Sequence, residues 1–400
     1  MLIQIKNSTP PNTNQFALFN LGFRPFFLGA GIFAIASITA WMLVYFSYGT
    51  ITMTNISISQ WHAHEMLYGY SMAVVAGFLL TAVKNWTGIP TLSGKPLMVL
   101  VMLWSIGRVL FLCGTSFIVW VALADILFGL MLMVAITMPI VKVKQWKQLA
   151  VLSKVVLLWI GNIIFYFACF GFFADGLNYA INGAILLFIS LILMIGRRVI
   201  PFFIERGVAT KVQLKQYKWL DISILVMFAA LFINVIFLKI LSLTMMFAWV
   251  LFILNGLRLM NWHTSGLWQV PLLWSLYLSA WLINLGFFFY GLQAQYSNLS
   301  ILTLHIFAIG GIGLMSLSMM SRVALGHTGR DIRNPSPWIK ATFVSLIASV
   351  LFRALVPMLL PQYYMHWMLV AAVLWVLGFA IFVWIYTPIL LRSRVDGMFG

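Results

Sequence analysis

The chain has 400 residues, of which 63% are hydrophobic, 16% aromatic and only 8% charged. Soluble domains carry roughly 25% charged residues, so this composition excludes an ordinary soluble protein and indicates a polytopic helical membrane protein. The formal net charge of +17 at pH 7 does not indicate a nucleic-acid partner, because the basic residues follow the membrane loops and fit a lipid bilayer instead.

The start of the chain and its two cysteines add little to this class. A removable signal peptide has a basic start, a short apolar core and a cleavage site. Residues 1–15 are polar and lack this pattern, so we expect no signal peptide. The first apolar segment should therefore remain as a membrane helix. Cys113 and Cys169 lie inside apolar runs without any paired spacing. We interpret them as packing residues rather than a disulfide or a zinc site.

Apolar segments long enough to cross a bilayer recur along the whole chain. A membrane-spanning helix needs about 20 apolar residues, and twelve segments meet this requirement. The sequence therefore predicts an all-α bundle of about twelve transmembrane helices. The segments lie near residues 25–47, 60–83, 96–113, 117–140, 150–173, 177–197, 219–238, 241–259, 269–291, 299–321, 339–357 and 364–390.

The basic residues predict the orientation of these helices. Short cytoplasmic loops are enriched in Lys and Arg. If the N-terminus is inside, all of the 24 basic residues lie at the cytoplasmic ends of the spans except Arg108, Lys239 and Arg353. An even number of spans then leaves both termini in the cytoplasm. We predict this topology because an odd number of helices, or an inverted orientation, would scatter the pattern.

The longest inward loop suggests how the chain is divided. Residues 198–218 separate six predicted helices from the other six. We predict a single transmembrane domain over residues 1–400, with residues 1–200 and 215–400 as candidate halves. Such a division is common in transporters that are built from repeated halves.

Two histidines and a carboxylate open the second apolar segment and mark the main candidate site. His62, His64 and Glu65 stand where this helix enters the membrane, and polar groups at that depth need a partner or a function. Residues two apart on a helix differ by about 200° in direction, so His62 and His64 should face opposite sides. The helix can then serve two sites, or one histidine can ligate while the other binds a supporting group. Both can also be interfacial side chains that reach for water.

The topology sorts the remaining histidines into an outer and an inner layer. His305 lies about 10 Å into the tenth span from the outer side, which is the depth of His62 and His64. His366 begins the last helix among aromatic residues, so we interpret it as an interfacial residue.

The outer histidines predict a cofactor. Neutral imidazole is a ligand of both haem iron and copper. We favour a b-type haem, because the apolar, aromatic-rich bundle offers the pocket that haem requires. Arg108 and Arg353 fall within spans three and eleven towards the outer side, where they could neutralise the haem propionates. The alternative for Arg108 is a structural ion pair with Asp125 in span four.

The inner layer consists of His263, between spans eight and nine, and His327, just beyond span ten. Arg322 and Arg330 flank His327, an arrangement typical of an anion-binding turn. The turn could hold the propionates of a second haem ligated by both histidines, or it could be a capped helix end that meets anionic lipid. About 33 Å of continuous helix separates His305 from His327, so one metal cannot bind both.

Several long motifs resemble the NnrS family. They occur in the expected order and cover most of the chain, with a departure at Lys84, where the family usually has proline. The motifs are Phe23–Phe27, Trp61–Tyr70, Gly77–Gly88, Gly196–Pro201 and Arg322–Arg330.

This resemblance implies a polytopic bacterial inner-membrane protein that contains haem and copper and takes part in the response to nitric oxide and nitrosative stress, a setting linked to denitrification. Glu65 is then the supporting or proton-handling partner of the ligands. The metal-binding histidines of the family correspond here to His62, His64, His263, His305 and His327.

Three functions stay open at this point. A haem protein that binds or detoxifies nitric oxide needs ligating imidazoles and an open iron position. A haem-copper-like nitric oxide reductase also needs a second nearby metal and a path of intramembrane carboxylates, of which there are few. A twelve-helix transporter of a metal-nitrosyl or small thiol complex would use the histidines along a substrate path. The sequence indicates no electron donor and assigns no reaction.

Overall fold

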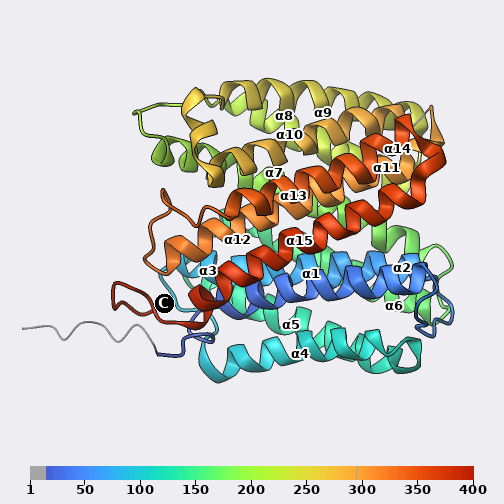
Figure 1. Ribbon diagram of the computed structural model, residues 1–400, viewed down its shortest axis with the longest axis horizontal. Helices are drawn as coiled ribbons and strands as arrows, with labels where there is room; N and C mark the ends of the chain where they lie inside the picture. The colour runs from blue at the N-terminus through green and yellow to red at the C-terminus, as the bar shows by residue number, and fades with distance from the viewer. Residues whose placement is uncertain (1–14, 294) are drawn as a thin grey trace, which may run out of the picture.

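The structure of the protein, a computed structural model, describes residues 15–293 and 295–400. Long helices run side by side through the whole molecule (Figure 1). Within the described ranges, twelve helical spans are long and apolar enough to cross a membrane, and the regular secondary structure is entirely helical. The predicted all-α polytopic bundle is confirmed.

Several of the spans are composed of more than one helical element. The first six spans and the turns that join them are α1 (Phe23–Tyr45), α2 (Ile58–His64), η1 (Glu65–Ser71), α3 (Met72–Thr87), α4 (Gly94–Leu112), η2 (Thr115–Phe117), α5 (Ile118–Lys142), η3 (Trp146–Gln148), α6 (Leu149–Cys169) and α7 (Gly176–Gly207). The remaining elements are α8 (Lys218–Ile233), η4 (Asn234–Leu238), α9 (Leu241–Asn261), η5 (Ser265–Gln269), α10 (Pro271–Leu292), η6 (Ser297–Leu299), α11 (Ser300–His305), η7 (Ile306–Gly313), α12 (Leu314–His327), α13 (Ile339–Val350), η8 (Leu351–Leu355), α14 (Val356–Leu359), η9 (Pro361–Tyr363) and α15 (Tyr364–Leu391).

The second span has clear start and stop signals. At its start, the backbone N–H of Ser57 donates to the Gln60 side chain at 2.8 Å, and the Ser57 hydroxyl accepts from the Gln60 backbone at 3.2 Å. This reciprocal capping box satisfies backbone donors that a helix start leaves free. The span ends at Gly88, whose φ of 72° suits glycine at a helix C-terminus. The element that carries His62 and His64 is therefore fixed at both ends.

The same span lies at the centre of the bundle. Its most apolar window is 78% buried inside the protein and that of α7 is 72% buried, whereas the windows of α4, α6, α8 and α15 are only 33% buried. Lipid covers the peripheral helices, so their outer faces can stay apolar without a protein partner. A buried polar side chain on the second span must instead find its partner within the protein.

The apolar core draws on both of the predicted halves. Phe27 and Phe128 come from the first half, and Phe287 and Phe379 come from the second, and all four belong to one cluster of buried side chains. Interior packing thus connects the two sides of the loop between α7 and α8.

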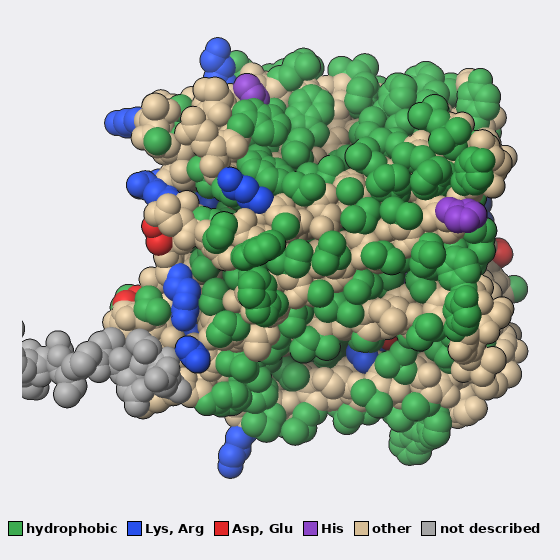
Figure 2. Space-filling model, viewed as in Figure 1, with side chains coloured by type: hydrophobic (Ala, Val, Ile, Leu, Met, Phe, Trp, Pro, Cys, Tyr) green, Lys and Arg blue, Asp and Glu red, His purple; other side chains and the backbone are tan. Residues whose placement is uncertain are grey.

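The two described ends of the chain meet on one face of the bundle. Ala17 donates its backbone N–H to the Leu391 carbonyl at 2.8 Å. The buried Arg24 guanidinium donates to the carbonyls of Leu390 at 2.8 Å and of Arg392 at 2.7 Å, which the end of α15 leaves without helical partners. This arrangement agrees with an even number of spans, and Lys and Arg side chains gather at the same end of the molecule (Figure 2).

The end with the basic residues should face the cytoplasm. Reporter fusions at residue 210 and after residue 400 should therefore both report a cytoplasmic location, because positively charged loops are retained on that side. Fusions in the turn between α1 and α2 provide the opposite control. A periplasmic signal at either of the first two positions would contradict this orientation.

Candidate cofactor cavity and buried polar network

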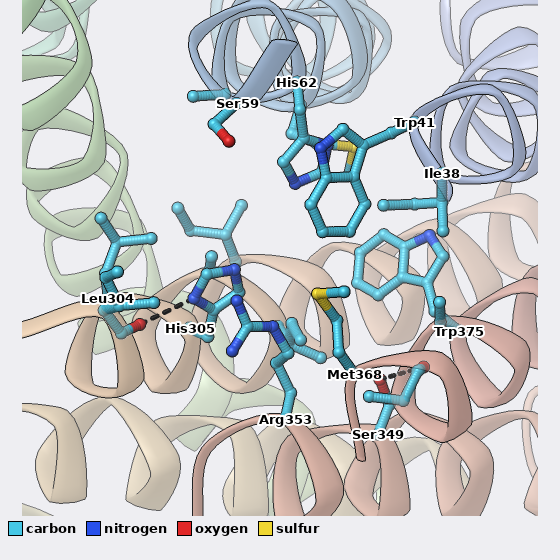
Figure 3. A pocket seen from close by; sticks show the side chains of 18 of the residues that line it. Ile38, Trp41, Ser59, His62, Leu304, His305, Ser349, Arg353, Met368 and Trp375 are labelled. Carbon is cyan, nitrogen blue, oxygen red and sulfur yellow. Dashed lines mark hydrogen bonds between the residues drawn. The ribbon is translucent and has the colours of Figure 1, made fainter. Parts of the chain in front are cut away.

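His62 and His305 face one cavity of about 320 Å³ in the half of the bundle away from the described chain ends (Figure 3). His62 comes from α2 and His305 is the last residue of α11, so the two imidazoles reach the cavity from different spans. Arg353 in η8 faces the same space. The cavity lies in the range of roughly 300–1,000 Å³ that is usual for small-molecule and cofactor sites.

The His62 ring is held in place by stacking. It lies against the Trp41 ring with centroids 4.4 Å apart and an angle of 20° between the planes. Its Nδ1 atom is buried and has no hydrogen-bond partner among the described residues. A buried polar atom without a partner is costly and calls for an explanation. A bound metal, or a ligand that accepts or donates a hydrogen bond, would provide one.

The His305 ring is oriented by the backbone of its own helix. Nδ1 lies 2.7 Å from the Ile301 carbonyl oxygen, which can only accept, so Nδ1 carries the proton. The lone pair is then on Nε2, which is the arrangement commonly found for metal-bound histidines. His305 can therefore offer Nε2 to a ligand in the cavity without losing its other hydrogen bond.

Arg353 brings a buried positive charge to this cavity. Its side chain is only 6% exposed, and its guanidinium lies 5.3 Å from the centroid of the Tyr364 ring. One guanidinium nitrogen, Nη1, is buried without a hydrogen-bond partner, and no ion pair in the described part of the chain includes Arg353. A guanidinium without a carboxylate partner in an apolar cavity favours an anionic group on whatever binds there.

Irregular helical segments adjoin all three of these polar residues. A π-helical segment, η7, follows His305 directly, and another, η8, contains Arg353. A third, η1, begins three residues after His62. π-helical segments are rare and frequently occur at functional sites. They widen the helix locally and alter the register of the side chains, which sequence periodicity does not reveal.

His64 lies on the other side of its helix, in a separate polar network. The side chain is fully buried, with Nδ1 2.9 Å from Glu65 Oε1 and Nε2 2.9 Å from Asn162 Oδ1. The rotation of about 200° between residues two apart explains why it does not join His62. The structure thus brings together two of the three predicted outer histidines and places the third elsewhere.

Arg108 completes this network rather than lining the cavity. Its guanidinium pairs with Glu65 and, at 2.5 Å, with both oxygens of Asp125. The Tyr166 hydroxyl donates to Asp125 Oδ2 at 2.6 Å. The structure therefore has the ion pair that was the alternative to a propionate contact for Arg108. Sequence reasoning missed Asn162 and Tyr166, although a polar residue in the middle of an apolar span is a recognisable signal.

The two inner histidines have different surroundings. His263 is exposed, and its Nε2 accepts a hydrogen bond from Trp268 at 3.1 Å. The ring centroids of His327 and Phe23 are 5.7 Å apart. The backbone carbonyl of His327 accepts a hydrogen bond from the Arg394 guanidinium at 3.0 Å. Among the described residues, no group of three or more His, Cys, Asp or Glu side chains is arranged to hold a metal. An inner site would therefore depend on few protein ligands.

The arginines of the inner turn also lack carboxylate partners. The Arg322 guanidinium lies 4.1 Å from the centroid of the Phe203 ring. The Nη1 atoms of Arg322 and Arg330 are both buried without a hydrogen-bond partner in the described part of the chain. In the segment after α15, by contrast, Arg394 does have a carboxylate partner, and its hydrogen bond lowers the pKa of Asp396 to about 2.

His366 is exposed beside Tyr363, which fits an interfacial position.

Replacing His327 by alanine tests whether the inner turn belongs to the outer site. We expect the variant to retain any cofactor in the cavity of His62 and His305, because roughly 33 Å of helix separates His327 from His305. The measurement is the cofactor content of purified protein relative to the unchanged chain. A variant that inserts normally but loses all of the cofactor would contradict two independent layers.

The fold and the cavity define a polytopic helical membrane protein with a histidine-lined internal site. The family model described as NnrS protein matches residues 17–394, and the chain therefore belongs to the NnrS family. A search of curated proteins gave no match. The resemblance identified from the motifs is confirmed, and family membership supports a membrane protein related to the nitric oxide response.

Proposed function

We propose that this protein binds haem in its outer cavity and acts in the response to nitric oxide at the bacterial inner membrane. The observation that carries the proposal is the convergence of two partly buried imidazoles and one guanidinium without a carboxylate partner on a single apolar cavity. His62 and His305 are the ligands in this proposal, and Arg353 is the partner of an anionic group.

The residues of the cavity fit a haem in three respects. The imidazoles of His62 and His305 each have a ring nitrogen without a protein partner, and neutral imidazole is a common axial ligand. Trp41 and Trp375 provide flat aromatic walls. Arg353 can neutralise a propionate. Haem iron would supply the capacity to bind nitric oxide, which would take the place of one of the two imidazoles, while these side chains would hold and orient the group and exclude water.

Copper is a second candidate for the same residues. Met66 and Met368 also line the cavity, and thioether sulfur together with imidazole suits Cu(I). Met66 Sδ lies 3.3 Å from the Ser37 hydroxyl, so one of the two sulfurs already has a polar contact. A copper ion held by His62, His305 and Met368 would leave Arg353 without a role, which is why we favour haem.

We favour binding of nitric oxide over its reduction. A reductase needs intramembrane carboxylates that pass protons to the metal site. Glu65 and Asp125 are the buried carboxylates at this depth, and both are paired with Arg108 outside the cavity. A transporter that exports a metal-nitrosyl or thiol complex would use the same cavity as a substrate site. In that case the purified protein should be colourless.

An absorption spectrum tests the proposal directly. The protein should be expressed with sufficient haem, purified from membranes and analysed for iron and copper. We expect a Soret band that shifts when nitric oxide is added, with iron and haem in equal amounts. Protein that is folded but colourless and free of both metals would contradict haem binding and would favour the transporter.

A further inference from the structure

A second, partly open apolar cavity lies next to the histidine cavity. It has a volume of about 90 Å³ and lies between α3, α7 and α12, with Phe27 of α1 at one wall. Ser71 and Ile312 line both cavities. Because these two residues are shared, the second cavity extends the first towards the face where the ends of α7 and α12 lie.

The hydroxyl protons in the lining of the second cavity are already engaged in hydrogen bonds with the protein. Ser71 and Ser316 carry the only hydroxyl groups in its lining. The Ser71 hydroxyl donates to the Met66 carbonyl at 2.8 Å, and the Ser316 hydroxyl donates to the Gly313 carbonyl at 2.8 Å. The other lining residues are aliphatic, aromatic, methionine or glycine. Apolar cavities of this kind stay dry and take up small apolar molecules such as xenon.

The wall between the two cavities is formed by irregular helix. Ser71 is the last residue of η1 and Ile312 lies in η7, and both segments are π-helical. Tyr70 lines the first cavity and Ser316 lines the second, and their hydroxyl groups are 2.5 Å apart. One hydrogen bond therefore connects the two linings at the same point where Ser71 and Ile312 are shared.

We propose that the second cavity binds a small apolar diatomic gas and passes it to the histidine cavity past Ser71 and Ile312. A volume of about 90 Å³ exceeds the roughly 10–15 Å³ that one water-sized molecule requires. An apolar diatomic gas loses no hydrogen bonds when it enters, whereas water or an ion would lose its partners. The delivery step rests on the proposed haem function, but the binding step does not.

Xenon tests the binding step without any cofactor. Crystals of the full chain under xenon pressure should show an anomalous peak between Val75, Val199 and Met315. Val75→Phe should remove the peak, because the larger ring fills the space. Val199→Phe fills the opposite side of the second cavity and replaces Val75→Phe in this test if that variant does not fold. Val134→Phe is the matched control, since Val134 is 48% exposed on α5, and it should keep the peak. Ordered water, a lipid chain or no xenon in the unchanged protein would overturn the gas site.

Carbon monoxide tests the delivery step in haem-loaded protein. After flash photolysis, Val75→Phe and Val199→Phe should slow the association of carbon monoxide about tenfold, which corresponds to a barrier higher by about 1.4 kcal/mol. Val134→Phe should leave the rate unchanged. An unchanged rate in variants that have lost the xenon peak would overturn delivery. Protein that shows the xenon peak but takes up no haem when haem is supplied would refute the proposed function and still support the gas site.

Discussion

Replacing His305 by alanine should remove most of the haem from the purified protein, and His62→Ala should have the same effect. Each change deletes one of the two imidazoles that face the cavity, and no third histidine lines it. Neither ring takes part in the buried ion pairs, so the variants should still insert and fold. The measurement is the Soret absorbance per protein, together with the iron content.

Two control variants make this prediction specific. His366→Ala should retain the haem, because His366 is exposed at the end of the last helix. Arg353→Gln should weaken retention without abolishing it, since a propionate would lose its charged partner but the iron would keep its ligands. If both His62→Ala and His305→Ala keep a full Soret band, haem binds elsewhere and the cavity needs another explanation.

The sequence predicted the membrane spans because hydropathy and chain geometry leave few alternatives. Every backbone polar group in a bilayer must be satisfied within its own segment, so a run of about 20 apolar residues forms a helix regardless of its neighbours. All twelve predicted spans are present in the described chain, although α7 continues to Gly207 and so makes residues 198–207 of the predicted inward loop helical. The orientation follows from the distribution of Lys and Arg and stays a prediction.

The sequence could group the outer histidines by depth but not by direction. Helical rise places His62, His64 and His305 at similar depths, and the spacing of two already indicates that His62 and His64 diverge. Which of them shares a cavity with His305 depends on how α2 and α11 are rotated in the bundle. That rotation is set by packing and by the π-helical segments η1 and η7, which have no reliable signature in a single sequence.

The partners of Arg108 were also beyond sequence reasoning, except for Asp125. Its network joins four spans, because Glu65 follows α2 and Asp125, Asn162 and Tyr166 come from α5 and α6. Such contacts between distant segments depend on which helices are neighbours in the bundle. Composition can show that a buried charge needs a partner, but it does not show which of several helices provides one.

The network around Arg108 should make a large contribution to stability, and Arg108→Leu should lower the free energy of unfolding by about 3–5 kcal/mol. The change removes one cation from between two carboxylates, Glu65 and Asp125, both of which are almost fully buried. Neither carboxylate can then keep its charge without a partner in the apolar interior. Denaturation by sodium dodecyl sulfate in mixed micelles, followed by circular dichroism, measures the loss.

Matched variants separate this effect from a general loss of arginine. Arg333→Leu removes the same side chain from an exposed loop and should change the stability by less than about 0.5 kcal/mol. Combining Arg108→Leu with Glu65→Gln and Asp125→Asn should recover much of the loss, because neutral groups that replace a complete buried ion pair cost far less than an isolated charge. If Arg108→Leu is as stable as Arg333→Leu, the buried pairs contribute little and His64 is held in place by packing against Phe165 and Tyr166 instead.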